Sequence, residues 1–233
     1  MHLLRATPAM LVATLAACGG ELEAASPRRA ESAPLLAALA DPAGPATGDL
    51  RSGRLPAARA RLEASLASDP DTIAALNDLA VSYSMEERFD AARQLLDEVL
   101  TRGGAREQQA ALVNLGELYA VDGYLTAAHA HLASAKAIDA SRPEPAYALA
   151  LLADARGDRA GAAAALREAL ESDRSGAARR ELAFLYPEER LHLDALVADA
   201  MGDATTADAR WRELARGRFQ ALAQAAQRHL EEP

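Results

Sequence analysis

The sequence has one Cys, three Phe and one Trp among its 233 residues, and only one of its 25 basic residues, Lys136, is a lysine. A single Cys excludes a disulfide framework and a zinc site built from several thiolates. The formal net charge of −9 and the isoelectric point of about 5.1 argue against a nucleic-acid binder. Nucleophile-elbow, dinucleotide-binding and phosphate-loop motifs are absent from the sequence, so we expect no enzyme activity and no cofactor.

Alanine is the residue that the sequence has in excess, with 60 copies, and half of all residues are hydrophobic. Alanine is the best helix former, and its small side chain lets two helix axes approach closely. The composition therefore predicts an all-α fold in which helices pack on helices.

The N-terminus reads as a signal segment over residues 1–17. Its apolar run, residues 9–17, is far shorter than the roughly 20 residues that a membrane-spanning helix needs. The four residues that end at Cys18, Leu-Ala-Ala-Cys, resemble the lipobox of bacterial lipoproteins. This resemblance implies cleavage before Cys18 and lipidation of its thiol. With Gly19 next, it also implies an outer-membrane lipoprotein that faces the periplasm. The alternative is a soluble secreted or periplasmic protein in which Cys18 is incidental.

Residues 18–48 combine the lipidated Cys with a stretch rich in Pro and Gly. This composition predicts a tether, with at most a turn or two of helix at residues 35–40.

The rest of the chain repeats a short phrase: a small or turn residue, an Ala five positions later, and a Leu or Trp four positions after that. The phrase begins at Gly53, Glu87, Gly123, Gly157 and Gly202. Successive Ala positions are separated by 34, 36, 34 and 45 residues, and the last interval contains an insertion between Ser175 and Pro187. A period of 34 is that of the tetratricopeptide repeat.

Residues 39–216 accordingly resemble a tetratricopeptide-repeat (TPR) protein. The pattern is fullest in the second and third copies, at Leu76, Leu79, Ala80, Tyr83, Phe89, Ala92 and Leu96, and at Leu112, Leu115, Gly116, Tyr119, Gly123, Ala128 and Leu132. The resemblance implies a right-handed superhelix of antiparallel helix pairs, with about four to five repeats over 49–216. We expect an extra helix near 176–185 and an amphipathic capping helix within 217–233.

In the TPR pattern the first helix of each pair lines a concave groove. The positions that the resemblance assigns to it here are Asn77, Val81, Met85, Val113, Asn114, Glu117, Tyr147, Leu151, Asp154, His192, Leu196 and Asp199. The set contains no Lys or Arg, unlike TPR modules that clamp a peptide carboxylate. We expect Asn77 and Asn114 to hold a peptide backbone through their amides, and the partner to be an extended or helical segment of another protein. The alternative is a concave face that binds nothing.

No metal site is expected. His129 and His131 lie two positions apart, about 200° around a helix, so they cannot chelate one ion together. Glu189 and His192 have the spacing found in di-iron bundles, but the sequence has no second such pair.

Together, the lipobox-like segment and the repeats favour a membrane-anchored adaptor or assembly factor. A factor similar to the pilotin lipoproteins that assemble secretins is one form of it, and a regulator that docks cell-wall hydrolases is another.

Overall fold

The computed structural model describes residues 30–231, so the predicted signal segment, the lipobox and Cys18 lie outside the described residues. Within that range the chain forms twelve α-helices, and its extended segments meet in one isolated antiparallel bridge, Ala37 with Ala183. None of the helices in this part of the chain is long and apolar enough to cross a membrane.

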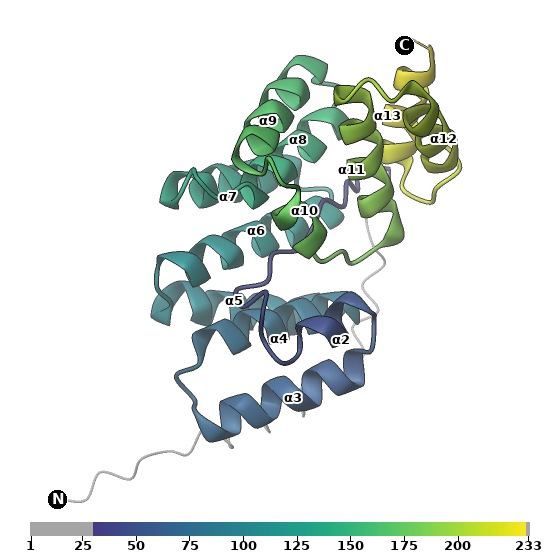
Figure 1. Cartoon of the computed structure of the whole chain (residues 1–233). Helices are drawn as coiled ribbons and strands as arrows, with labels where there is room; N and C mark the ends of the chain where they lie inside the picture. The colour runs from purple at the N-terminus through teal and green to yellow at the C-terminus, as the bar shows by residue number, and fades with distance from the viewer. Residues whose placement is uncertain (1–29, 232–233) are drawn as a thin grey trace, which may run out of the picture.

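Ten of the helices form five antiparallel pairs that stack along one direction (Figure 1). The pairs are α2 (Thr47–Arg51) with α3 (Leu55–Ser68), α4 (Ile73–Met85) with α5 (Phe89–Arg102), α6 (Ala105–Val121) with α7 (Leu125–Ile138), α8 (Glu144–Ala155) with α9 (Arg159–Ser172), and α11 (Pro187–Ala200) with α12 (Ala204–Leu214). The fold is thus an all-α solenoid of the TPR type, as the repeat spacing predicted.

The first residue of the repeated phrase lies in the turn between the two helices of each pair, and it has a positive φ in all five copies. The angle is 70° at Gly53 and 74° at Gly202, values at which a Cβ is disfavoured. Glu87 adopts the same conformation with φ 57°, and it is the one non-glycine residue with positive φ in the described range. The periodic glycine therefore marks a left-handed turn that reverses the chain.

Small residues allow close packing inside the pairs. A Cβ added to Gly116 on α6 would lie 2.7 Å from Cδ2 of Leu132 on α7, far inside van der Waals contact. Ala80 and Ala92 are fully buried at the equivalent place in the preceding pair. These contacts explain why a chain with few aromatic residues still builds a continuous core.

The insertion after α9 contains less helix than the sequence predicted. Helix α10 covers only Ala177–Glu181, because the Asp173 carboxylate accepts hydrogen bonds from the first backbone N–H groups and Leu182 already has extended dihedral angles. Residues 182–186 continue as an extended segment, and Pro187 opens α11. The prediction of a helix through residue 185 is therefore wrong in its second half.

The last helix, α13 (Gln220–Glu231), packs against α12 and also reaches α8. It buries Leu222, Ala225 and Ala226 and leaves Gln224 and Gln227 exposed on its outer side. It covers the last apolar face of the stack, in the place where the sequence predicted a cap.

The expected tether is wrong for residues 32–40. Every residue of this stretch is buried, and its backbone is extended rather than helical. The physical reason is that the stretch is uncharged and lies in the groove, where side chains of the solenoid satisfy its backbone. Residues 41–46 then form a turn, tied by the Thr47 hydroxyl to the Asp41 carbonyl, that leads into α2.

Candidate peptide-binding groove

The concave face of the solenoid is occupied by residues 32–40, which we call the strap. The strap is the purple trace that passes from the level of α4 to the level of α11 in Figure 1. Its groove contacts come from α4 and α6, and its other edge faces the insertion after α9. The site is built from these three parts.

At the N-terminal end of the strap, carbonyl groups from the last turn of α6 act as acceptors. The Ser32 hydroxyl donates to the Val121 carbonyl at 2.7 Å, and the Ala33 N–H donates to the Ala120 carbonyl at 3.0 Å. The last carbonyls of a helix have no partner within it, so they are available to a neighbouring chain segment. This end of the strap is thereby fixed to the end of α6.

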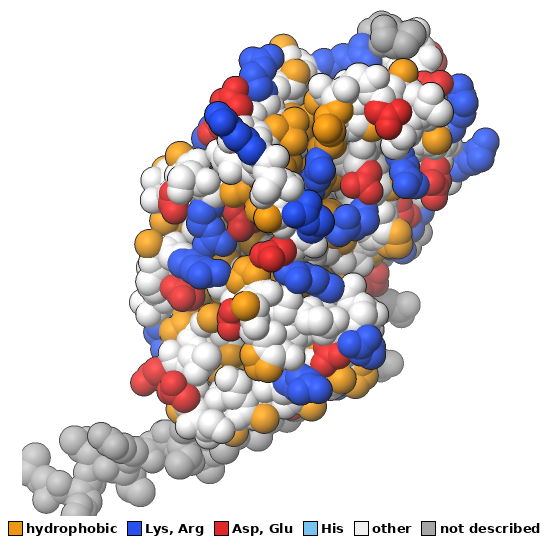
Figure 2. Space-filling model, in the orientation of Figure 1, with side chains coloured by type: hydrophobic (Ala, Val, Ile, Leu, Met, Phe, Trp, Pro, Cys, Tyr) orange, Lys and Arg blue, Asp and Glu red, His pale blue; other side chains and the backbone are white. Residues whose placement is uncertain are grey.

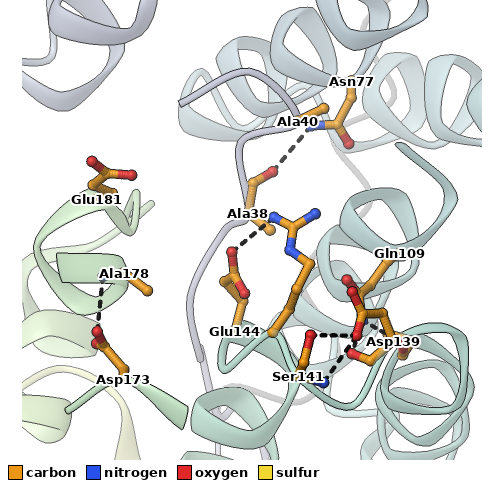
Figure 3. Close-up of polar contacts among 12 residues, drawn as sticks. Ala38, Ala40, Asn77, Gln109, Asp139, Ser141, Glu144, Asp173, Ala178 and Glu181 are labelled. Carbon is orange, nitrogen blue, oxygen red and sulfur yellow. Dashed lines mark hydrogen bonds and ion pairs between the residues drawn. The ribbon is translucent and has the colours of Figure 1, made fainter. Parts of the chain in front are cut away.

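At the centre of the strap, two asparagine side chains hold the backbone of one residue, Ala38. Asn114 accepts a hydrogen bond from the Ala38 N–H at 2.8 Å, and both Asn114 and Asn77 donate to the Ala38 carbonyl at 3.0 Å. Asn114 also donates to the Asn77 side-chain oxygen at 2.9 Å. Figure 3 shows Asn77 directed at the backbone of Ala38. The residues that we expected to bind a peptide backbone therefore lie against one, and it belongs to this chain.

Two buried carboxyl groups receive further N–H groups of the strap. Glu117 on α6 accepts from Leu35 and Leu36, at 2.5 and 3.1 Å, and Asp78 on α4 accepts from Ala40 at 2.8 Å. Burial raises the pKa of Asp78 to about 7 and that of Glu117 to about 8. The strap therefore lies on carboxyl groups that hold protons more tightly than exposed ones do.

Glu189 of α11 is a second fully buried carboxyl group, and it lies near Glu117. Burial and the neighbouring Glu117 carboxyl both raise the pKa of Glu189. Glu189 in turn accepts the N–H groups of Leu185 and Tyr186, at 2.8 and 3.1 Å. Two neighbouring buried carboxyls thus accept backbone N–H groups, Glu117 from the strap and Glu189 from the extended segment after α10.

The insertion covers the outer edge of the strap. Ala37 and Ala183 exchange backbone hydrogen bonds of 2.9 and 3.2 Å, which form the isolated bridge. Arg51 of α2 donates twice to the Glu181 carbonyl, at 3.2 and 3.0 Å. Figure 3 shows the strap running between Asn77 on one side and Ala178 and Glu181 on the other. The groove is therefore closed over the strap by residues 173–186, which we call the cover.

The apolar groove positions are core residues. Val81, Val113, Tyr147, Leu151 and Leu196 are all buried, whereas Met85 at the end of α4 is half-buried. The Tyr147 hydroxyl donates to the Asp173 carboxylate at 3.1 Å and so ties α8 to the start of the cover. Burial beside that carboxylate raises the pKa of the Tyr147 hydroxyl. These side chains shape the groove from within the core.

The acidic and histidine positions nearest the C-terminus form a separate cluster. Asp154 on α8 accepts hydrogen bonds of 2.7 Å from His192 on α11 and from His229 on α13. Burial raises the pKa of Asp154, but the two histidines outweigh it and hold this pKa well below its usual value. Trp211 stacks on His229 with ring centroids 4.0 Å apart, and its indole N–H donates to the Asp199 carboxylate at 2.7 Å. The cluster fastens the capping helix and contacts no strap residue in these hydrogen bonds.

A hollow between α9 and α11 holds the apolar patch visible in the upper part of Figure 2. Its volume is about 580 Å³, and Leu166, Leu170 and Leu196 line it together with Arg167 and Arg174. It lies where the insertion separates α9 from the next pair. Over the described part of the chain, no group of three or more acidic, His or Cys side chains is placed to hold a metal ion.

Sequence reasoning missed the strap, Asp78 and His229. The strap had one usable signal, because residues 32–40 carry no charge although a solvated tether normally does. Asp78 and His229 carried none, since a single Asp or His on a helix is most often a surface residue.

A family model matches part of the chain, in agreement with this fold. Residues 49–115 match a family model described as tetratricopeptide repeat. Among solved structures, the chain is similar to one titled "Crystal structure of MamA", with 16% sequence identity and a TM-score of 0.42, over 81% of this chain and 98% of that one. No curated protein sequence matches the chain at a significant level.

Proposed function

We propose that this chain is a membrane-anchored scaffold for protein–protein interaction, which binds an extended segment of another protein in its concave groove. One observation carries the proposal: Asn77 and Asn114 bind both the N–H and the carbonyl of a single residue, Ala38, at 2.8 to 3.0 Å. Such contacts recognise an extended main chain whatever its side chains are. Solenoids built from helix pairs use their concave faces in this way.

Four more backbone N–H groups of an extended segment find acceptors in the same groove. Those of residues 33, 35, 36 and 40 are taken by the end of α6, by Glu117 and by Asp78. The contacts cover eight consecutive residues, which is the length of a typical bound peptide strand. The groove is therefore equipped for the main chain of a peptide.

The anchor is the second part of the proposal. The lipobox-like sequence before Cys18 supports lipidation of that thiol and attachment to the outer membrane, with the solenoid facing the periplasm. Fourteen positions separate Cys18 from Ser32, so the fully extended chain spans at most about 50 Å. The solenoid would thus work close to the bilayer, as an adaptor or assembly factor. A pilotin-like role in secretin assembly is one form of this function.

The anchor is tested by Cys18→Ser. We expect the native chain to sediment with membranes and to carry the mass of its acyl chains, and the variant to be released into the soluble fraction. Equal fractionation of the two proteins would favour the secreted or periplasmic alternative without a lipid.

The groove is tested with a labelled 13-residue peptide of residues 30–42. The receptor is the full chain carrying Ala38→Pro, which removes the N–H that Asn114 accepts and leaves every groove side chain in place. We expect a rise in fluorescence anisotropy that is lost when Asn114→Ala is added and kept when Gln108→Ala is added, because Gln108 bonds the Leu100 carbonyl instead. A folded Ala38→Pro chain that binds no peptide would contradict the proposal.

A further inference from the structure

We infer that the strap is an intramolecular occupant of the groove, which a segment of another protein with similar chemistry displaces. The inference rests on the proposed function and specifies how the groove is regulated and which segment it accepts. In the structure the groove is closed, and binding is an exchange of one extended segment for another.

The strap is placed to leave without unfolding a helix. All of its hydrogen bonds described above run to other parts of the chain, on α4, α6 and the cover. After residue 40 a turn at residues 41–46 separates it from α2. The strap can therefore separate as a unit while the five helix pairs stay stacked.

The two parts of the cover are held differently: the extended part buries Leu182, Ala183 and Tyr186, whereas α10 lies on the surface. The extended part meets the strap through the Ala37–Ala183 bridge, and α10 is tied to the first pair through Arg51 and the Glu181 carbonyl. The five-residue α10 buries none of its residues. Opening of the Ala37–Ala183 bridge together with outward movement of α10 gives an incoming segment its access.

The strap also specifies the chemistry of the partner segment. It carries no charge, and its two adjacent leucines, Leu35 and Leu36, are fully buried. Ala38 faces a cavity of only about 40 Å³ between the strap and the cover, so a large side chain does not fit there. Glu117 and Asp78 beneath the strap disfavour an acidic residue. The partner segment is therefore extended and uncharged, with two leucines followed by small residues.

A disulfide between strap and cover tests the displacement. Facing residues of a hydrogen-bonded antiparallel pair have Cα atoms about 5.5 Å apart, which suits a disulfide. We therefore place Ala37→Cys and Ala183→Cys together in the Cys18→Ser chain. The probe is the labelled peptide of residues 30–42, and the matched control is the chain with Ala37→Cys alone.

We expect the oxidised double variant to bind the peptide at least tenfold more weakly than its reduced form, and reduction to restore binding. The control should be unaffected by reductant. Ala38→Pro should bind about tenfold more tightly than the native chain, because the apparent affinity rises with the fraction of open groove. A peptide with Asp in place of both leucines should not bind.

Three results would overturn the inference. Equal binding by the oxidised and reduced forms would show that the strap need not leave, although peptide binding as such would stand. Equal affinity of the native and Ala38→Pro chains would show that the strap does not compete. A native chain that forms dimers by exchanging straps, seen in light scattering, would make the occupant a second copy. Failure of every folded variant to bind would instead contradict the proposed function itself.

Discussion

Truncating Asn114 to alanine should free the strap. The change removes three hydrogen bonds, of 2.8, 3.0 and 2.9 Å, to the Ala38 N–H, the Ala38 carbonyl and Asn77. The carbonyl keeps its bond from Asn77, but the Ala38 N–H and the Asn77 oxygen lose the partners that they have in the structure. Each buried polar group left without a partner costs about 1–3 kcal/mol. We expect the free energy of strap opening to fall by about 2–4 kcal/mol, since water entering the space recovers part of the loss.

Hydrogen exchange of the strap amides measures this free energy directly, because local opening limits their exchange. A loss of about 2–4 kcal/mol corresponds to exchange about 30- to 700-fold faster. The control, Gln108→Ala, should leave the strap unchanged. In the Ala38→Pro background, Asn114→Ala should lower the free energy of strap opening by a smaller amount, with a difference of about 1 kcal/mol or more. The reason is that the Ala38 N–H, which Asn114 accepts, is already absent there. If the strap amides of a folded Asn114→Ala chain exchange hydrogen at rates within about threefold of those in the native chain, the reasoning is refuted.

Three further predictions concern stability. Because burial raises the pKa of Glu117 to about 8, the folded chain holds a proton there that the unfolded chain releases above about pH 4.5; stability should therefore fall as pH rises from 4.5 to 8. Glu117→Gln should reduce this dependence in urea titrations without abolishing it, because the pKa values of Asp78 and Glu189 are also raised; a native stability that rises over this range would contradict it. Gly116→Ala should cost about 1–3 kcal/mol through its overlap with Leu132 and become neutral or stabilising once Leu132→Ala is present; equal costs in both backgrounds would disprove the close contact. Glu87→Gly should stabilise by up to about 1 kcal/mol in thermal unfolding by relieving its φ of 57°, and a clear decrease in Tm would show that the Glu87 side chain matters more.

The repeats could be predicted from the sequence because their signals are local. Each repeat has a residue with positive φ in its turn, an alanine at a close helix crossing and a leucine or tryptophan between pairs. Local contacts fix these positions, so the same sequence pattern recurs in every pair. The groove positions of Asn77 and Asn114 followed from this spacing. The cluster at Asp154 could not be placed in the same way, because His229 comes from the capping helix, beyond the last repeat.

The strap escaped prediction for the opposite reason. Its partners lie far away in the sequence: Leu35 bonds Glu117 across 82 residues, and Ala38 bonds Asn77 across 39. An extended segment that buries both faces shows neither helical nor alternating periodicity. Proline and glycine on either side of it are also typical of a linker. Composition predicted a solvated tether here because it cannot show that Asn77 and Asn114, far away in the sequence, form hydrogen bonds with the strap backbone.

The position of the strap in the chain sets the order in which the protein can fold. The strap leaves the ribosome first, yet its bridge partner Ala183 is synthesised 146 residues later. Helix pairs can stack as they emerge, because their contacts are local, whereas a pairing over such a distance pays a large loop-closure cost and forms slowly. The strap can therefore dock on α4 and α6 once residue 121 has been made, whereas the groove closes over it only when about four-fifths of the chain exists. Closure of the groove over the strap is then a separate, late step of folding, slower than the growth of the solenoid.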